Sequence, residues 1–404
     1  MEVFTHFYQV NLEKLKIFSE TFYVLYRQSL ARPLITVLVT AHKRRQYIKK
    51  ALDSVRAQNI DRSEYEVIVV SNFESSYEGL GNLRWITVDE EGLSPKIAVG
   101  FEEARGEVVS ILEDDDQWLP DKLRLVRDIM RREYVDLLHN SKIRTYDDRV
   151  LPPDEQVDLR SCSFSARVGP GFKGADLRKF PRLWSCVYNN SAMSLRRDFV
   201  SQDQRLMKFF KTYNDTPGVD WLLTLYAFEH GVALHVPEPL TLLNTHNYFN
   251  GLRLPPGVRL ADAIRTRRSH LEVFKFLSSR CKTLTCKLVV DVLKMGDYPY
   301  FLFADSAGRV NLRPRRVLTR FVGENLVPYI LLVLYSPRMF FVRTLWILAP
   351  SIMIRLVASE PVRLSTKYSH KGLFLLNSGY STNGTLIVSR AAPSPGNVTD
   401  VTVY

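Results

Sequence analysis

The sequence predicts an α/β fold built on a mostly parallel sheet. Three observations support this prediction: short continuous apolar runs typical of strands covered on both faces, an amphipathic stretch typical of a helix, and the alternation of such segments over residues 35–130. In a sheet of this kind ligands bind beyond the carboxyl ends of the strands. We therefore expect a site where the first, second and fourth predicted strands end.

The predicted elements follow one another in chain order. The pattern over residues 33–58 predicts a strand followed by a helix. An apolar run ("ITVLV") comes first, and the apolar residues after it are spaced on one helical face. Further strands are predicted at 65–72, 83–90 and 107–116. A helix is predicted at 94–106, with Pro95 suited to its first turn and Gly106 to its C-cap.

The rest of the chain is less regular. Residues 139–250 are rich in aromatic side chains and end in a predicted helix (219–231) and strand (232–243), and residues 258–295 have a helical pattern. We divide the chain into an N-terminal extension (1–32), a catalytic domain (33–250, with halves 33–120 and 121–250), a helical, partly apolar region (251–375), and a tail (376–404). The composition of the tail is typical of a flexible segment.

Charge and cysteine usage narrow the function classes. The 404 residues include 46% hydrophobic residues, enough for a real core, and carry a formal charge of +12. A basic surface attracts nucleic acids, anionic membranes or phosphate-bearing small molecules. No nucleic-acid module with the expected basic and aromatic spacing is present, so we expect no nucleic-acid partner. Four cysteines without CxxC spacing predict a reduced, cytoplasmic chain, and the opening residues lack the pattern of a signal peptide.

The stretch "ILEDDDQW" (111–118) places four acids directly behind an apolar strand. A hard cation such as Mg²⁺ or Mn²⁺ would relieve their repulsion, since it prefers oxygen ligands and is usually held by one or two carboxylates together with substrate phosphates. The alternative is a solvated acidic loop, stabilised by the dipole of a helix that starts near Pro120. The residues alone leave both interpretations open.

Residues 33–120 resemble glycosyltransferase family 2, whose members have the A-type glycosyltransferase fold. The resemblance rests on "VLVTAHKR", "LDSVRAQ", "VIVVSNFE", "EGLSPKIAVGFEEARGE" and "LEDDDQW", which follow the order, spacing and chemistry of the family's motifs. It continues through "NNSAMSLRRD", "GVDWLLTLYAFEHG" and "VPEPLTLLNTHNYFN" to about residue 250. The dense form of the middle motif is similar to an archaeal branch of the family.

The resemblance implies roles on the donor side. Glu113 and Asp115 match the Asp-x-Asp pair, with Asp115 as the metal ligand and Asp114 beside it, although a shift that pairs Asp114 with Asp116 stays open. The remaining donor-side residues are candidates to line the nucleotide sugar: Thr40, His42, Ser71, Asn72 and Lys96. Ser71 and Asn72 replace the usual aspartates, which puts the base preference in doubt. Lys96 is otherwise a surface lysine.

On the acceptor side, the resemblance suggests Asp220 as the general base, against an ordinary helix N-cap. His246 is a candidate third metal ligand, against a structural histidine. Trp184 and Asn190 are placed at an acceptor pocket by position alone.

The implied function is a metal-dependent, inverting transfer of a sugar from a nucleotide-diphosphate donor to an acceptor hydroxyl on a glycan, a lipid-linked saccharide or a polyprenyl phosphate. The alternative is a catalytically inactive relative that binds nucleotides or carbohydrates. Residues 325–358 are strongly apolar but interrupted by prolines and arginines, which predicts either short helices at the cytoplasmic membrane surface or a buried hairpin.

Overall fold

The computed structural model describes residues 33–303 and the pairs 363–364 and 386–387. The first range excludes short gaps at 147–148, 154–155, 157–161, 174–175, 177–182, 184–185, 216–217 and 246–255. The predicted extension (1–32), His246, Trp184 and the apolar stretch 325–358 lie outside the described residues. None of the described helices is both long enough and apolar enough to cross a membrane.

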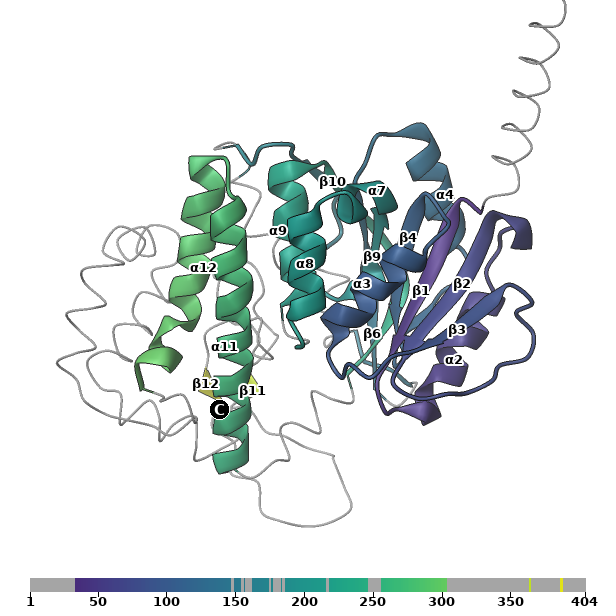
Figure 1. Cartoon of the computed structure of the whole chain (residues 1–404), viewed down its shortest axis with the longest axis horizontal. Coiled ribbons are helices and arrows are strands. Elements are labelled where there is room, and N and C mark those ends of the chain that lie inside the picture. Colours follow the sequence, from purple (N-terminus) through teal and green to yellow (C-terminus); the bar gives the residue numbers. More distant parts are fainter. Residues whose placement is uncertain are drawn as a thin grey trace, which may run out of the picture.

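The first half of the domain has the predicted alternation of strands and helices (Figure 1). Its elements are β1 (Ile35–Ala41), α2 (Arg45–Arg56), β2 (Tyr65–Ser71), β3 (Leu83–Thr87), α3 (Leu93–Glu103) and β4 (Val108–Glu113). β1 pairs in parallel with both β2 and β4, and β2 pairs in parallel with β3. The predicted mostly parallel α/β sheet is therefore confirmed.

The second half extends the same sheet. Its elements are β5 (Gln117–Trp118), α4 (Lys122–Arg132), β6 (Leu137–Tyr146), β7 (Arg149–Val150), β8 (Ala166–Val168), β9 (Met193–Arg196), α7 (Arg197–Ser201), α8 (Gln204–Thr212), α9 (Val219–His230) and β10 (Ala233–Asn244). The strand order is β3-β2-β1-β4-β9-β6-β10-β5, with β7 beside β6 and β8 beside β10. β9 is antiparallel to its neighbours β4 and β6, whereas β6 and β10 are parallel.

Alternating side chains of β1 enter two separate cores. Val37 and Val39 join the core that α2 and α4 cover, and Leu38 joins the core under α3, α8 and α9. Successive residues of a strand point to opposite faces, so the continuous apolar run of β1 is what a sheet with helices on both faces requires.

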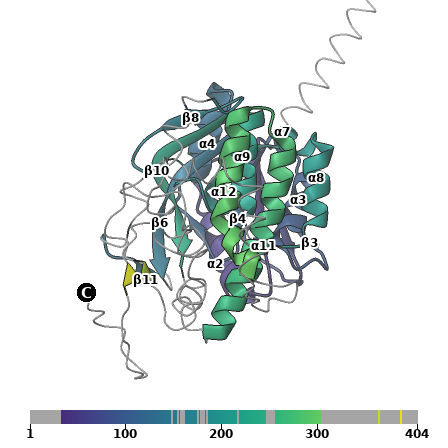
Figure 2. The same ribbon diagram turned by 90° about the vertical axis from the view of Figure 1, so that its left-hand side faces the viewer.

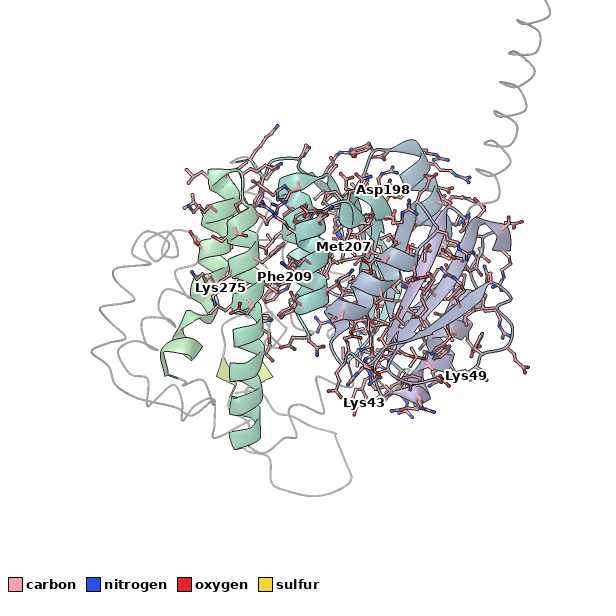
Figure 3. All side chains as sticks on the ribbon, viewed as in Figure 1. Lys43, Lys49, Asp198, Met207, Phe209 and Lys275 are labelled. Atoms are coloured by element: carbon pink, nitrogen blue, oxygen red, sulfur yellow. A yellow bond between two sulfur atoms is a disulfide. The ribbon has the colours of Figure 1, made fainter. Side chains whose placement is uncertain are left out.

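Two long helices, α11 (Pro256–Arg280) and α12 (Leu284–Phe303), lie side by side next to α9 (Figures 1 and 2). Phe276 of α11 stacks on Phe209 of α8, which Figure 3 labels. Glu229 of α9 accepts hydrogen bonds from the backbone N–H groups of Lys282 and Thr283 at the turn between the two helices. The helical pair is thus packed on the α/β domain, against α8 and α9.

One local prediction is wrong, and one strand was missed. Gly106 does not cap α3, which ends at Glu103 with Ala104 as its C-cap. A Cβ at Gly106 would lie 2.5 Å from the backbone N of Thr36, so glycine is needed there for a close approach to β1. The ten-residue strand β6 was not predicted either. Its apolar run is broken by polar residues that the fold buries, among them His139 and Lys142.

The expectation of reduced cysteines is also corrected. Cys162 pairs with Cys186 and Cys281 pairs with Cys286, each as a disulfide. The first pair is 24 residues apart in sequence, and only the fold brings these two segments together. Disulfides persist mainly in oxidising compartments, so the cysteines give no support to a reducing, cytoplasmic location.

Candidate active site

The carboxyl ends of β1, β2 and β4 meet at one edge of the sheet, as predicted. Thr40 is in register with Glu113 of β4, and Ala41 with Ser71 of β2. Figure 3 shows Lys43, two residues after β1, at the lower edge of the domain in that view. The predicted donor residues are therefore brought together although they are far apart in sequence.

The acid cluster is a compact group of oxygen atoms. One carboxylate oxygen each from Glu113, Asp115 and Asp116 lie within 4.8 Å of one another. Asp114, Asp115 and Asp116 are 0%, 8% and 2% exposed, and α4 begins only at Lys122. The interpretation as a solvated loop at a helix start is therefore wrong.

Each outer acid of the cluster is held by polar groups from distant segments. Asp116 accepts hydrogen bonds from Asn189 Nδ2 (3.0 Å), Ser191 Oγ (2.6 Å) and the backbone N of Asn244 (2.9 Å). Asn190 Nδ2 donates to Glu113 Oε1 at 2.8 Å. Burial, followed by repulsion from neighbouring carboxylates, raises the pKa of Glu113 and of Asp116. A cation at this point would relieve both costs.

The oxygen atoms around the acid cluster are suitable ligands for a hard divalent cation. The amide oxygens of Asn189 and Asn190 are buried and, among the described residues, have no hydrogen-bond partner, although their amide nitrogens bond to the acid cluster. Buried polar oxygens are costly when unpaired. Carboxylate and amide oxygens together form the ligand type that Mg²⁺ and Mn²⁺ prefer.

A basic side chain of the protein also contacts the acid cluster. Arg44, the residue before α2, forms ion pairs with Asp114 through Nη2 and with Asp115 through Nη1. Asp114 also accepts the backbone N–H of His42 at 3.2 Å. Burial raises the pKa of Asp114 to about 6, although Arg44 acts in the opposite direction.

The predicted nucleotide residues divide into two groups. Thr40 Oγ1 and His42 Nδ1 are buried without a hydrogen-bond partner among the described residues, as expected of atoms that await a ligand. Burial, with nearby lysines, lowers the pKa of His42, so its ring is neutral near pH 7. Asn72 Oδ1 accepts the backbone N–H of Lys43 at 3.1 Å.

Ser71 and Lys96 form hydrogen bonds with neighbouring parts of the chain. Ser71 is fully buried, and its hydroxyl donates to Phe73 O and accepts the indole N–H of Trp85 at 2.9 Å. Lys96 is 1% exposed, so it is not a surface lysine. Its ammonium donates to the carbonyls of residues 90, 91 and 92, which fixes the turn before α3, and burial lowers its pKa to about 8.

Asp220 is the second residue of α9, and the N-cap position belongs to Gly218. One oxygen of Asp220 accepts the backbone N–H of Asn189 and the other that of Trp221, both at 2.9 Å. Burial raises its pKa. Asn189 thus links Asp220 to Asp116, so the candidate base and the acid cluster border one loop.

Sequence reasoning missed three site residues, Asn189, Ser191 and Asn244. Arg44 was placed only as part of the basic run "HKRR", expected near the phosphates, and its pairing with the acids was not predicted. The other three contact the acids only through the tertiary fold. One local signal was available, since an asparagine pair precedes a strand here, and asparagine tolerates the positive φ (72°) that Asn189 adopts.

Comparisons with known proteins agree with this geometry. Residues 36–200 match the family model of glycosyl transferase family 2. A protein of Nostoc sp. (strain PCC 7120), named an uncharacterized glycosyltransferase, is 27% identical over 128 residues, which cover 29% of this chain. The matched stretch spans only 39% of that relative's length.

Solved structures resemble this chain in fold. The crystal structure of S. aureus TarS 1-349 and its complex with UDP-GlcNAc align with TM-scores of 0.51 and 0.53, at 14% identity. Each alignment covers 80% of this chain and 90% of the TarS chain. Residues 36–200, which match the model of glycosyltransferase family 2, include the acid cluster and the strand ends around it.

Proposed function

We propose that the protein transfers a sugar from a nucleotide-diphosphate donor to an acceptor hydroxyl, with inversion and with a divalent cation. The observation that supports this most directly is the position of the Glu113, Asp115 and Asp116 oxygens, within 4.8 Å of one another at the carboxyl edge of a family 2 sheet. The TarS structure with UDP-GlcNAc has a similar fold, which supports a nucleoside diphosphate sugar as the donor class.

The donor-side residues have distinct tasks in this proposal. Thr40, His42 and Asn72 line the nucleoside, and Lys96 positions the turn beside it. Asp115 holds Mg²⁺ or Mn²⁺ with Glu113 or Asp116, and His246, outside the described residues, remains the candidate further ligand. When bound, the cation supplies Lewis-acid stabilisation of the leaving diphosphate.

On the acceptor side, Asp220 receives the proton of the attacking hydroxyl at a carboxylate oxygen. Its burial raises its pKa above that of an exposed aspartate, which makes its ionised form a stronger base. Asn190 binds Glu113, so it borders the donor site as well as the acceptor pocket in which it was predicted. Trp184 remains a candidate from its position in the sequence.

The test is to measure nucleotide release from a panel of UDP-, GDP- and other nucleotide sugars with Mn²⁺, with Mg²⁺ and with EDTA. We expect release that depends on the metal, and its loss in Asp115→Ala because that change removes a ligand oxygen. Asp121→Ala, which removes an exposed acid at the start of α4, is the matched control and should keep the activity. Nucleotide binding without any release would identify the inactive relative instead.

We further propose an acceptor at a membrane surface, such as a lipid-linked saccharide or polyprenyl phosphate. This rests on the composition of residues 325–358, an apolar stretch interrupted by three arginines that suit lipid phosphates. Full-length protein and residues 1–320 should differ in flotation with anionic liposomes at high salt. Equal flotation of the two would refute the proposal.

A further inference from the structure

Arg44 contacts Asp115, which the proposed function assigns to the metal, and its neighbour Asp114. It follows β1 by three residues, and its guanidinium bridges Asp114 and Asp115, which are neighbours in sequence. The side chains of the two acids are 0% and 7% exposed, and that of Arg44 is 28% exposed. A planar guanidinium that contacts two buried carboxylates forms a strong, charge-assisted pairing.

The charges around the cluster explain why this arginine lies there. Four carboxylates, from residues 113 to 116, are crowded at one strand end, and unneutralised charges are costly in a buried place. Lys96 acts on Asp114 through space, but its ammonium is bound to three backbone carbonyls. Arg44 therefore neutralises Asp115 by direct contact.

A divalent cation and Arg44 compete for this carboxylate. The guanidinium binds Oδ2 of Asp115, and two cations that share one small site repel each other. A nucleoside diphosphate changes this balance, because its oxygens offer a guanidinium a new bidentate partner of the kind that arginine prefers. Arg44 is partly exposed, so it is free to turn from the acids to a bound anion.

We propose that Arg44 is a resident counter-cation that occupies Asp114 and Asp115 in the free protein and moves to the donor's diphosphate, so that metal and nucleotide bind together. This rests on the proposed function. It goes further by naming a residue that couples the binding of the metal to the binding of the nucleotide. By linkage, each ligand strengthens the binding of the other by the same factor.

The test measures Mn²⁺ affinity by electron paramagnetic resonance, without nucleotide and with UDP or GDP. In Arg44→Gln we expect Mn²⁺ alone to bind at least about tenfold more tightly, because its competitor is gone. We expect UDP or GDP, measured with saturating Mn²⁺, to bind at least about tenfold more weakly, because a diphosphate partner is lost. These opposite signs distinguish the exchange from a structural role, which would weaken both, and from simple phosphate binding, which would leave Mn²⁺ alone unchanged.

Two further variants complete the design. Lys49→Gln removes one exposed positive charge from α2, the helix that follows Arg44, and should leave both affinities unchanged. If its thermal midpoint shows that Arg44→Gln is poorly folded, Arg44→Lys takes its place. Lysine keeps the charge but makes only a single point contact, so both affinities should lie between those of the wild type and those expected for Arg44→Gln. Unchanged or weaker binding of Mn²⁺ alone in folded Arg44→Gln, while the wild type binds Mn²⁺ with nucleotide, overturns this inference and leaves the proposed function standing. A wild type that binds no Mn²⁺ with either nucleotide overturns both.

Discussion

At the scale of single residues, the site is defined by polar side chains whose burial removes them from water and leaves them dependent on a partner. Thr40 Oγ1 and His42 Nδ1 are buried without hydrogen-bond partners in the described part of the chain, and Asp114, at 0% exposure, depends on Arg44. Such groups cost stability unless a ligand or counter-charge compensates them. Their concentration at one sheet edge is the residue-level signature of a binding site.

Asp220→Asn should lower turnover by about 100-fold or more, because the amide keeps the shape of the side chain but cannot accept a proton. Since burial raises the pKa of Asp220, wild-type turnover should rise with pH as this carboxyl deprotonates, at a pH above that for an exposed aspartate. The rise should vanish in the variant. Turnover at several pH values, with donor affinity measured separately, checks this.

The same variant separates catalysis from structure. Both oxygens of Asp220 accept backbone N–H groups, and an amide can replace only one of these bonds. If urea unfolding shows a loss of stability in proportion to the loss of turnover, Asp220 holds the loop at Asn189 and is not the base.

At the scale of elements, the segment 186–191 is the part of the fold on which both halves of the site depend. Its backbone carbonyls at Cys186 and Tyr188 accept hydrogen bonds from the buried ammonium of Lys142, at 2.6 and 2.9 Å. Its side chains hold two acids of the cluster, and its backbone holds Asp220. β6 therefore supports the site from within the sheet, through Lys142. This strand was not predicted from the sequence because polar residues interrupt its apolar run.

Asn189 allows the roles of backbone and side chain to be separated. Asn189→Gly suits the φ of 72° but removes the amide bound to Asp116, so we expect nearly unchanged stability and reduced activity. Asn189→Ala loses the same amide and adds backbone strain of about 1 kcal/mol or more. Urea unfolding and donor hydrolysis measure the two effects.

For these variants, equal activity of Asn189→Gly and wild type would show that the amide has no role at the cluster. Equal stability of the alanine and glycine variants would show that the backbone conformation at this position carries no strain.

At the scale of the whole molecule, the two disulfides join parts of the chain that the sheet alone does not fix. Cys162–Cys186 ties the segment before β8 to the segment that holds the site, and Cys281–Cys286 joins the end of α11 to α12. Neither disulfide links the helical pair to the α/β domain; Glu229 of α9 makes that connection by accepting hydrogen bonds at the α11–α12 turn.

The denatured, unreduced protein should show no free thiols, and four after reduction. Cys162→Ser should lower the free energy of unfolding by about 3 kcal/mol and Cys281→Ser by about 2 kcal/mol, because a 24-residue separation constrains the unfolded chain more than a 5-residue one. Urea unfolding under non-reducing conditions measures both. Four reactive thiols before reduction would show that the cysteines are free.

The sequence by itself determined the local chemistry of the first half: its alternating elements, the edge at which the strands end, and the acids and polar groups at those ends. These features follow from periodicity and strand alternation over short distances, so they can be read without the fold. The spacing of motifs was also enough for the family resemblance, which the family model bears out over residues 36–200.

Only the tertiary structure decided which groups satisfy those acids. Arg44 lies about 70 positions from its partners, Asn244 reaches Asp116 across 128 positions, and Cys186 finds Cys162 across 24. Such contacts depend on strand order and on the burial of polar residues in β6. Neither feature produces a periodic pattern of apolar residues in the sequence. The physical reason is that hydrophobic patterning reports which face of an element is buried, whereas the pairing of buried charges depends on which elements meet.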